Sequence, residues 1–166
     1  MPCDNRVILA AAGSGKTTTI VNEAKEKRGK RVGLVTFTNN AEGEFRKKLY
    51  KEEGFVPDHV RSMTWFKFLL RHFIRPYQRT LLEGRIRGIH LSPGKSALYV
   101  PASDIRRYNT DKTNRIYNDK IADFACKIID ATDGAPIRRA EDIFDRIYID
   151  EVQDMAGYDL NFIERL

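Results

Sequence analysis

One segment near the N-terminus constrains the fold of this chain more than any other. The apolar run at residues 6–10 leads into four small residues and then into Gly15-Lys16-Thr17. A strand that delivers the chain into a loop of small residues lets backbone N–H groups converge on phosphate oxygens without intervening side chains. The spacing from Ala10 to Thr17 is typical of a phosphate-binding loop, with alanine in place of the usual first glycine. A chance Gly-Ser-Gly turn is the alternative, but the position between a predicted strand and a predicted helix argues against it.

This loop predicts a nucleotide site. The Lys16 ammonium would reach the β- and γ-phosphates, and the Thr17 hydroxyl would ligate Mg²⁺. We therefore expect ATP and Mg²⁺ as cofactors. The predicted nucleotide-binding residues are Ala12, Gly13, Ser14, Gly15, Lys16, Thr17 and Thr18.

The rest of the chain alternates short apolar runs with amphipathic stretches, which is typical of βαβ units and a parallel sheet flanked by helices. Strands are predicted at 6–10, 31–36, 59–63 and 145–149. Helices are predicted from apolar residues at helical spacing, namely Ile20, Val21 and Ala24, then Ala41, Phe45 and Leu49, then Phe66, Leu69, Leu70 and Phe73, and finally Tyr117, Ile121, Phe124, Ala125 and Ile128. The sequence thus predicts an α/β fold.

Residues 76–115 interrupt this alternation. They contain Pro76, Pro93 and Pro101 and a single short apolar stretch at 97–100. We interpret them as an inserted subdomain or a long excursion from the sheet. They are also basic, since residues 75–115 carry nine Lys/Arg and three Asp/Glu.

The charge is distributed unevenly along the chain. Residues 1–115 carry a net charge of +12 and residues 116–166 carry −6, for a total of +6. A basic region of this size suits a polyanion such as nucleic acid. An ordinary soluble surface can also be basic, so charge alone leaves both interpretations open.

A second chemical motif ends the last predicted strand, at Ile149-Asp150-Glu151-Val152-Gln153. An apolar strand that ends in two acids places Asp150 at the carboxyl edge of the sheet, where it can share Mg²⁺ with Thr17. Glu151 is then placed to polarise the attacking water. An acidic pair after a strand is often only a solvated turn, but its occurrence downstream of a phosphate-binding loop favours the catalytic interpretation.

Taken together, the motifs resemble those of the UvrD/Rep/PcrA-like superfamily 1 helicases. The resemblance rests on four segments in the family order: 10–17, Thr36-Phe37-Thr38-Asn39, Met63-Thr64-Trp65-Phe66, and 150–154. It implies a RecA-like P-loop NTPase fold, with residues 1–166 forming the first motor domain. It also implies ATP-driven 3′ to 5′ movement on single-stranded DNA. The catalytic residues would be Glu151, Lys16 and Gln153, with Gln153 sensing the nucleotide and Thr17 and Asp150 holding the metal.

The same resemblance implies a single-stranded DNA contact at Thr36, Phe37, Thr38, Asn39, Thr64, Trp65 and Phe66. Exposed aromatic rings beside a basic groove provide stacking platforms for bases. Short hydroxyl and amide side chains suit phosphates. Core packing is the alternative for Phe37 and Trp65, because aromatic residues near strand ends are often buried. Gln153 can likewise be an ordinary surface residue.

The chain also departs from the family pattern. No glutamine matches the adenine-reading motif before residue 10, Thr18 replaces a frequently basic residue, and Phe66 replaces a common histidine. The second RecA-like domain and its arginine fingers do not occur within the 166 residues. We therefore expect this chain alone to be nearly inactive as an ATPase and to need that domain as a partner, in cis or in trans.

Cysteine content and the absence of targeting segments indicate where the protein acts. Cys3 and Cys126 are too few for a disulfide scaffold, and no segment resembles a signal peptide or a membrane span, so we expect a cytoplasmic protein, which would be nucleoid-associated if bacterial. His59, His72 and His90 share no ligand spacing, and His72 is expected at the surface or its boundary. Two other functions stay open: a nucleotide-dependent switch that regulates a partner, and an RNA-directed helicase.

Overall fold

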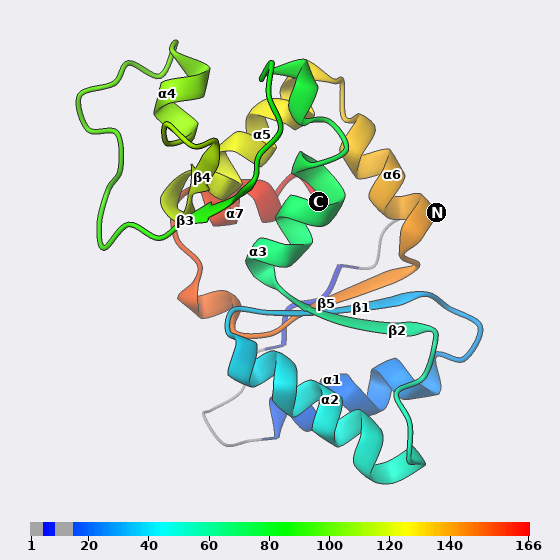
Figure 1. The fold of residues 1–166 in the computed structure, drawn as a ribbon. Coiled ribbons are helices and arrows are strands. Elements are labelled where there is room, and N and C mark those ends of the chain that lie inside the picture. The colour runs from blue at the N-terminus through cyan, green and yellow to red at the C-terminus, as the bar shows by residue number, and fades with distance from the viewer. Residues whose placement is uncertain (1–4, 9–14) are drawn as a thin grey trace.

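The computed structural model describes residues 5–8 and 15–166. Its centre is a parallel sheet with the strand order β2–β1–β5, formed by β1 (Val32–Thr36), β2 (Val60–Thr64) and β5 (Arg146–Ile149). Val35 pairs with Met63 on one side and with Ile149 on the other. The three strands therefore end at the same edge of the sheet (Figure 1). This arrangement confirms the predicted α/β fold with a parallel sheet flanked by helices.

Two helices cover one face of the sheet: α1 (Lys16–Glu26) and α2 (Asn39–Glu53). As the periodicity predicts, they bury Val21 and Ala24 of α1 and Phe45 and Leu49 of α2. Helix α2 begins where the Thr38 hydroxyl accepts a hydrogen bond from the Ala41 N–H at 3.1 Å. The small apolar core on this face holds both helices against β1 and β2.

The opposite face carries a larger core under several elements (Figure 1). These are α3 (Trp65–Phe68), the π-helical turn η1 (Leu69–Ile74), α5 (Ile121–Ala131), α6 (Ala135–Ile143) and α7 (Tyr158–Ile163). The sequence predicts neither α6 nor α7. No helix among the described residues is long and apolar enough to cross a membrane.

The helix after β2 differs in detail from its predicted face. Leu69, Leu70 and Phe73 are buried as predicted, but Phe66 is only half-buried and His72 is buried. The buried residues Trp65, Phe68, Leu69, His72 and Phe73 stand at i, i+3, i+4, i+7 and i+8, so the buried face begins at Trp65, one residue before the predicted Phe66. The helical period is therefore right, but the predicted face starts at the wrong residue, and this leaves His72 outside it.

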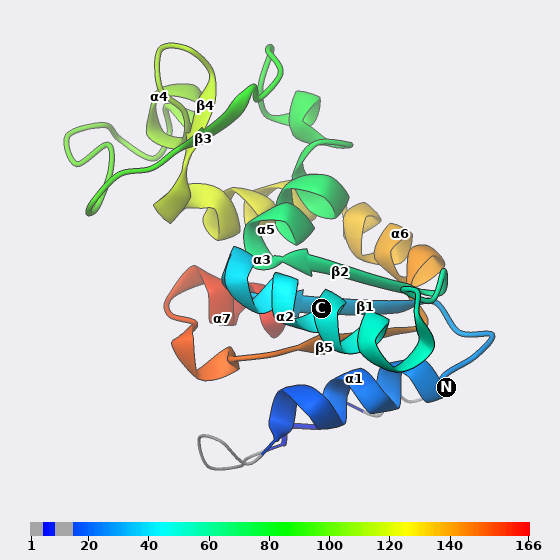
Figure 2. The same cartoon turned by 60° about the horizontal axis from the view of Figure 1, so that its bottom comes forward.

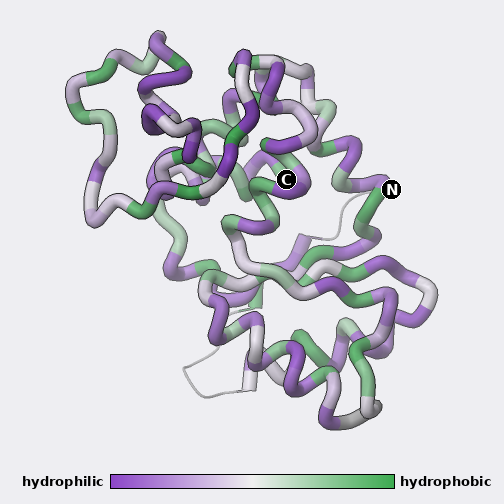
Figure 3. Tube along the Cα trace, viewed as in Figure 1, coloured by the Kyte–Doolittle hydropathy of each residue, from purple (hydrophilic) through white to green (hydrophobic). Residues whose placement is uncertain are grey.

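Residues 76–115 extend away from the parallel sheet (Figure 2). They contain the 3₁₀ turn η2 (Gln78–Thr80), β3 (Gly88–His90) and α4 (Ile105–Asn109). Strand β3 pairs in parallel with β4 (Arg115–Tyr117), which leads through η3 (Asn118–Lys120) into α5. Hydrophilic stretches are frequent along this segment and are interrupted by short hydrophobic ones (Figure 3).

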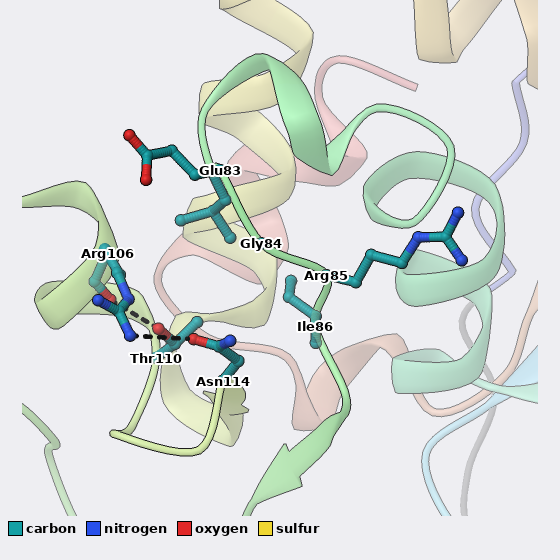
Figure 4. A pocket seen from close by; sticks show the side chains of 8 residues that line it. Glu83, Gly84, Arg85, Ile86, Arg106, Thr110 and Asn114 are labelled. Atoms are coloured by element: carbon teal, nitrogen blue, oxygen red, sulfur yellow. Dashed lines mark hydrogen bonds between the residues drawn. The ribbon is translucent and has the colours of Figure 1, made fainter.

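A small pocket lies between residues 82–86 and residues 106–114 of this segment (Figure 4). Arg106 donates a hydrogen bond across it to Asn114 Oδ1 at 3.4 Å, and the Thr110 hydroxyl donates to the Arg106 carbonyl at 2.8 Å. Its lining residues are Leu82, Glu83, Gly84, Arg85, Ile86, Arg106, Thr110 and Asn114. None of the predicted site residues lines it.

The strand predicted at residues 6–10 is not formed in its described part. Residues 5–8 have no strand structure, and Val7 and Ile8 are exposed to 83% and 47%. Arg6 instead pairs with Glu23 of α1 at 3.0 Å, and Glu23 also accepts a hydrogen bond from the Tyr148 hydroxyl of β5. Residues 9 and 10 lie outside the described residues.

His72 is the clearest departure from expectation, because it lies in the core and not at the surface. Its side chain packs edge-on against Phe144, with ring centroids 5.0 Å apart, and neither ring nitrogen has a hydrogen-bond partner. Burial, together with the positive charges of Arg139, Arg71 and Arg61, lowers the pKa of the imidazole to about 4.

Acid should therefore destabilise the fold through His72. The folded-state pKa lies below the ordinary value, so the unfolded chain takes up the proton first, and stability falls as the pH drops through 6.5 toward 4. Between pH 7 and pH 5 we expect a loss of about 2 kcal/mol in the free energy of unfolding. Urea unfolding at both pH values measures it. His72→Leu should lose about 2 kcal/mol less over the same interval, and an equal loss in both proteins would contradict the assignment.

Candidate functional site

The start of α1 and the end of β5 meet at the carboxyl edge of the sheet. Thr17, in the first turn of α1, donates a hydrogen bond from its hydroxyl to Asp150 Oδ2 at 2.9 Å, although the two residues are 133 positions apart. The Asp150 backbone N–H donates to the Val35 carbonyl at 2.9 Å, which extends the pairing of β5 with β1 by one residue. Asp150 itself is 5% exposed. The structure thus brings together the two residues predicted to share a metal ion.

The donor atoms of this pair fit Mg²⁺. Both are hard oxygen atoms, which Mg²⁺ prefers. An octahedral Mg²⁺ ion has bonds of about 2.1 Å at right angles, so neighbouring ligands lie about 3 Å apart. The separation of Thr17 Oγ1 from Asp150 Oδ2, 2.9 Å, matches that geometry.

The predicted phosphate-binding loop is only partly within the described residues. Ala12, Gly13 and Ser14 lie outside them. Gly15 precedes α1 with φ +82°, a conformation that glycine adopts without strain, and its carbonyl accepts a hydrogen bond from the Thr19 N–H at 2.9 Å. Lys16 is the first residue of α1, so it lies at the N-terminal, electropositive end of that helix. Thr18 is exposed and accepts a hydrogen bond from the Lys48 ammonium of α2 at 3.0 Å.

The acidic segment after β5 has an unusual backbone. Glu151 has φ +60° and ψ +40°, the left-handed region that a residue with a side chain seldom adopts. The turn η4 (Val152–Asp154) follows, and within it the Gln153 amide donates a hydrogen bond to Glu151 Oε2. Such backbone strain concentrates at functional sites, because the surrounding structure must enforce it. Glu151 thus follows Asp150 directly, with its N–H donating to Asp150 Oδ1 at 3.1 Å, and Gln153 is oriented toward Glu151.

The segment after β1 was predicted to contact single-stranded DNA, and the structure divides it into buried and exposed parts. Thr36 is 1% exposed and its hydroxyl has no partner. Phe37 is half-buried, whereas Thr38 and Asn39 are exposed at the start of α2. Thr38 and Asn39 are thus free to approach a ligand at this edge.

The segment after β2 is more deeply buried than a DNA contact would be. Thr64 is 7% exposed and caps α3 by accepting a hydrogen bond from the Lys67 N–H at 3.4 Å. Trp65 is 0% exposed, so in this conformation no base can stack on its ring, and the core interpretation holds for this residue. Phe66 is half-buried. The reason is α7, whose Phe162 packs against Trp65 with ring centroids 5.5 Å apart.

Sequence reasoning missed two acidic residues near this edge. Glu42, in the first turn of α2, pairs with Lys67 of α3 at 2.7 Å and thereby joins the starts of the two helices. Asp159 of α7 accepts a hydrogen bond from the Trp65 indole N–H at 2.7 Å. Neither residue is part of a sequence motif. Each makes its contact with a residue that is distant in the sequence, so the sequence alone gives no signal for it. Among the described residues, no cluster of His, Cys, Asp and Glu could hold a metal ion without other ligands.

Comparison with known families agrees with this geometry. Residues 2–92 match the family model of the UvrD/REP helicase N-terminal domain. The chain belongs to this family. The match confirms the resemblance to UvrD-like helicases and assigns the chain to the N-terminal, motor part of such a helicase. The search of curated proteins found no match.

The UvrD/REP match covers part of the predicted site directly. It contains the predicted phosphate-binding loop and the segments Thr36–Asn39 and Thr64–Phe66. The acidic residues Asp150 to Gln153 lie beyond it. Their link to the family region is structural, through the hydrogen bond between Thr17 and Asp150.

Proposed function

We propose that residues 1–166 form the first RecA-like motor domain of a UvrD-like DNA helicase that binds Mg·ATP and moves 3′ to 5′ on single-stranded DNA. The observation that carries the proposal is the hydrogen bond from Thr17 to Asp150, which joins the first turn of a family-matched helix to the acidic segment after β5. When bound, ATP with its Mg²⁺ ion supplies a phosphoanhydride bond activated for attack by water. The residues of the chain would hold the nucleotide and orient it for this attack.

In this proposal the nucleotide-binding residues are those predicted from residue 12 to residue 18. Lys16 neutralises the β- and γ-phosphates, and Thr17 with Asp150 would hold the Mg²⁺ ion. Glu151, which follows Asp150 and has a left-handed backbone, orients the attacking water. Gln153 reports the state of the nucleotide through its contact with Glu151.

Single-stranded DNA would lie along the exposed residues at the carboxyl edge. Thr38 and Asn39 offer short polar groups for phosphates, and the half-buried rings of Phe37 and Phe66 offer edges for bases. Residues 76–115 form an inserted basic subdomain in this proposal. In the part of the chain that the structure describes, eight exposed Lys and Arg residues lie between residues 76 and 115.

Removing the ammonium of Lys16 tests the proposal. Lys16→Ala should weaken Mg·ATP binding at least about 10- to 100-fold, because a charged hydrogen bond to phosphate contributes about 1.5–3 kcal/mol. Isothermal titration calorimetry of the 166-residue chain measures this change. Lys27→Ala, which removes an exposed lysine at the far end of α1, should leave the affinity unchanged. Equal binding by Lys16→Ala and the wild type would refute the nucleotide site.

A further inference from the structure

The tryptophan Trp65 connects two parts of the predicted site that are far apart in sequence. Its indole N–H donates a hydrogen bond to Asp159 Oδ1 at 2.7 Å, and its ring packs edge-on against Phe162, with an interplanar angle of 85°. Both partners belong to α7, which follows the acidic segment through the buried residue Met155. Helix α7 is thus attached to Trp65 by one polar and one aromatic contact.

On its other side, Trp65 contacts the segment that follows β1. The rings of Phe37 and Trp65 stack with centroids 6.4 Å apart and an interplanar angle of 26°. Phe37 lies directly before Thr38 and Asn39, the exposed residues of that segment. Trp65 therefore lies between the acidic segment with its helix and the proposed DNA-contacting segment, and it is buried on all sides.

The polar contact holds α7 and Trp65 together because Asp159 has few other partners. Its side chain makes no ion pair among the described residues and, besides the indole, accepts a hydrogen bond from the Ala156 backbone N–H; burial raises the pKa of its carboxyl. Separating α7 from Trp65 would leave this half-buried carboxylate and the buried indole N–H without their hydrogen bond. Any shift of the acidic segment that carries α7 with it must therefore move Trp65, and with it Phe37.

We propose that Asp159 is a positioning residue that couples the nucleotide site to the single-stranded DNA site through Trp65. The inference rests on the proposed function, since it requires both ligands to bind. A nucleotide that reorders Asp150 to Gln153 changes the position of α7, and Trp65 transmits this change to Phe37. By linkage, DNA bound at Phe37 changes nucleotide affinity by the same factor.

The test measures the coupling itself. Anisotropy of a fluorescent oligo(dT) gives the DNA dissociation constant of the 166-residue chain with and without the magnesium complex of a non-hydrolysable ATP analogue. We expect the two constants to differ at least about fivefold in the wild type. Asp159→Leu should bring their ratio to about one while each ligand still binds alone. Asp159→Asn, whose amide oxygen still accepts from the indole, should retain most of the ratio.

Two further measurements separate coupling from general damage. Trp65 is the single tryptophan of the chain, so its fluorescence should respond to the ATP analogue in the wild type and not in Asp159→Leu. Asp142→Leu, at an exposed position of α6, should behave as the wild type. If Asp159→Leu does not fold, Trp65→Phe removes the donor, keeps an aromatic ring and should also bring the ratio to about one.

The outcomes distinguish this inference from the proposed function. A folded Asp159→Leu protein with wild-type coupling overturns the role of Asp159. A wild-type chain that binds both ligands with a ratio of one overturns the coupling and leaves the proposed function standing. A chain that binds neither ligand overturns the proposed function, and the inference fails with it.

Discussion

Replacing Trp65 by alanine should lower the free energy of unfolding by about 3–5 kcal/mol, the usual cost of truncating a buried aromatic side chain to alanine. The ring is 0% exposed and packs against Phe37, Phe68 and Phe162. Truncation leaves a cavity between the sheet and α7 and also removes the hydrogen bond to Asp159. Chemical denaturation followed by circular dichroism measures the change.

Matched variants show whether burial causes this loss. Phe37→Ala should cost less than Trp65→Ala, because Phe37 is only half-buried. Trp65→Phe should also cost less, since most of the apolar volume remains. If Trp65→Ala were as stable as the wild type and lost DNA binding alone, Trp65 would be an exposed stacking platform, as the family resemblance implies.

The contrast between Thr17 and Trp65 shows what the sequence could predict. The motifs predict that Thr17 and Asp150 each follow a strand of a parallel sheet, and the carboxyl ends of parallel strands share one edge. Their meeting across 133 positions therefore follows from motif order and topology alone. The confirmed inner faces of α1 and α2 follow from periodicity in the same way.

The burial of Trp65 could not be predicted in this way. It depends on α7, a helix of six residues that begins after Gly157 and is too short for its periodicity to be recognised. His72 was missed because the buried face of its helix begins at Trp65 and not at Phe66, and a histidine seven residues after Trp65 is not recognised as a core residue from its polarity. At positions 6–8 the apolar pattern predicts a strand, yet these residues form none, and Arg6 pairs with Glu23 of α1.

The second large effect concerns catalysis. Steady-state phosphate release by the purified 166-residue chain should stay near background and respond little to single-stranded DNA. The chain supplies Thr17 and Asp150 for the metal and Glu151 for the water, but phosphoryl transfer also needs a cation on the γ-phosphate as negative charge develops there. In the proposed function this cation is an arginine of a second RecA-like domain, and such a finger is worth about 10³–10⁵ in rate.

Adding the second RecA-like domain of a family member should therefore raise turnover toward that range, and single-stranded DNA should then stimulate it. Glu151→Gln should abolish the restored turnover and retain ATP binding, because the amide keeps the size of the side chain but cannot accept a proton from water. Glu141→Gln, the same change at an exposed position of α6, should leave the restored turnover intact. Fast, DNA-stimulated turnover by the 166-residue chain alone, at concentrations where it is monomeric, would show that the chain supplies its own cation. That cation would then have to be sought among its own arginines, and the dependence on a second domain would be wrong.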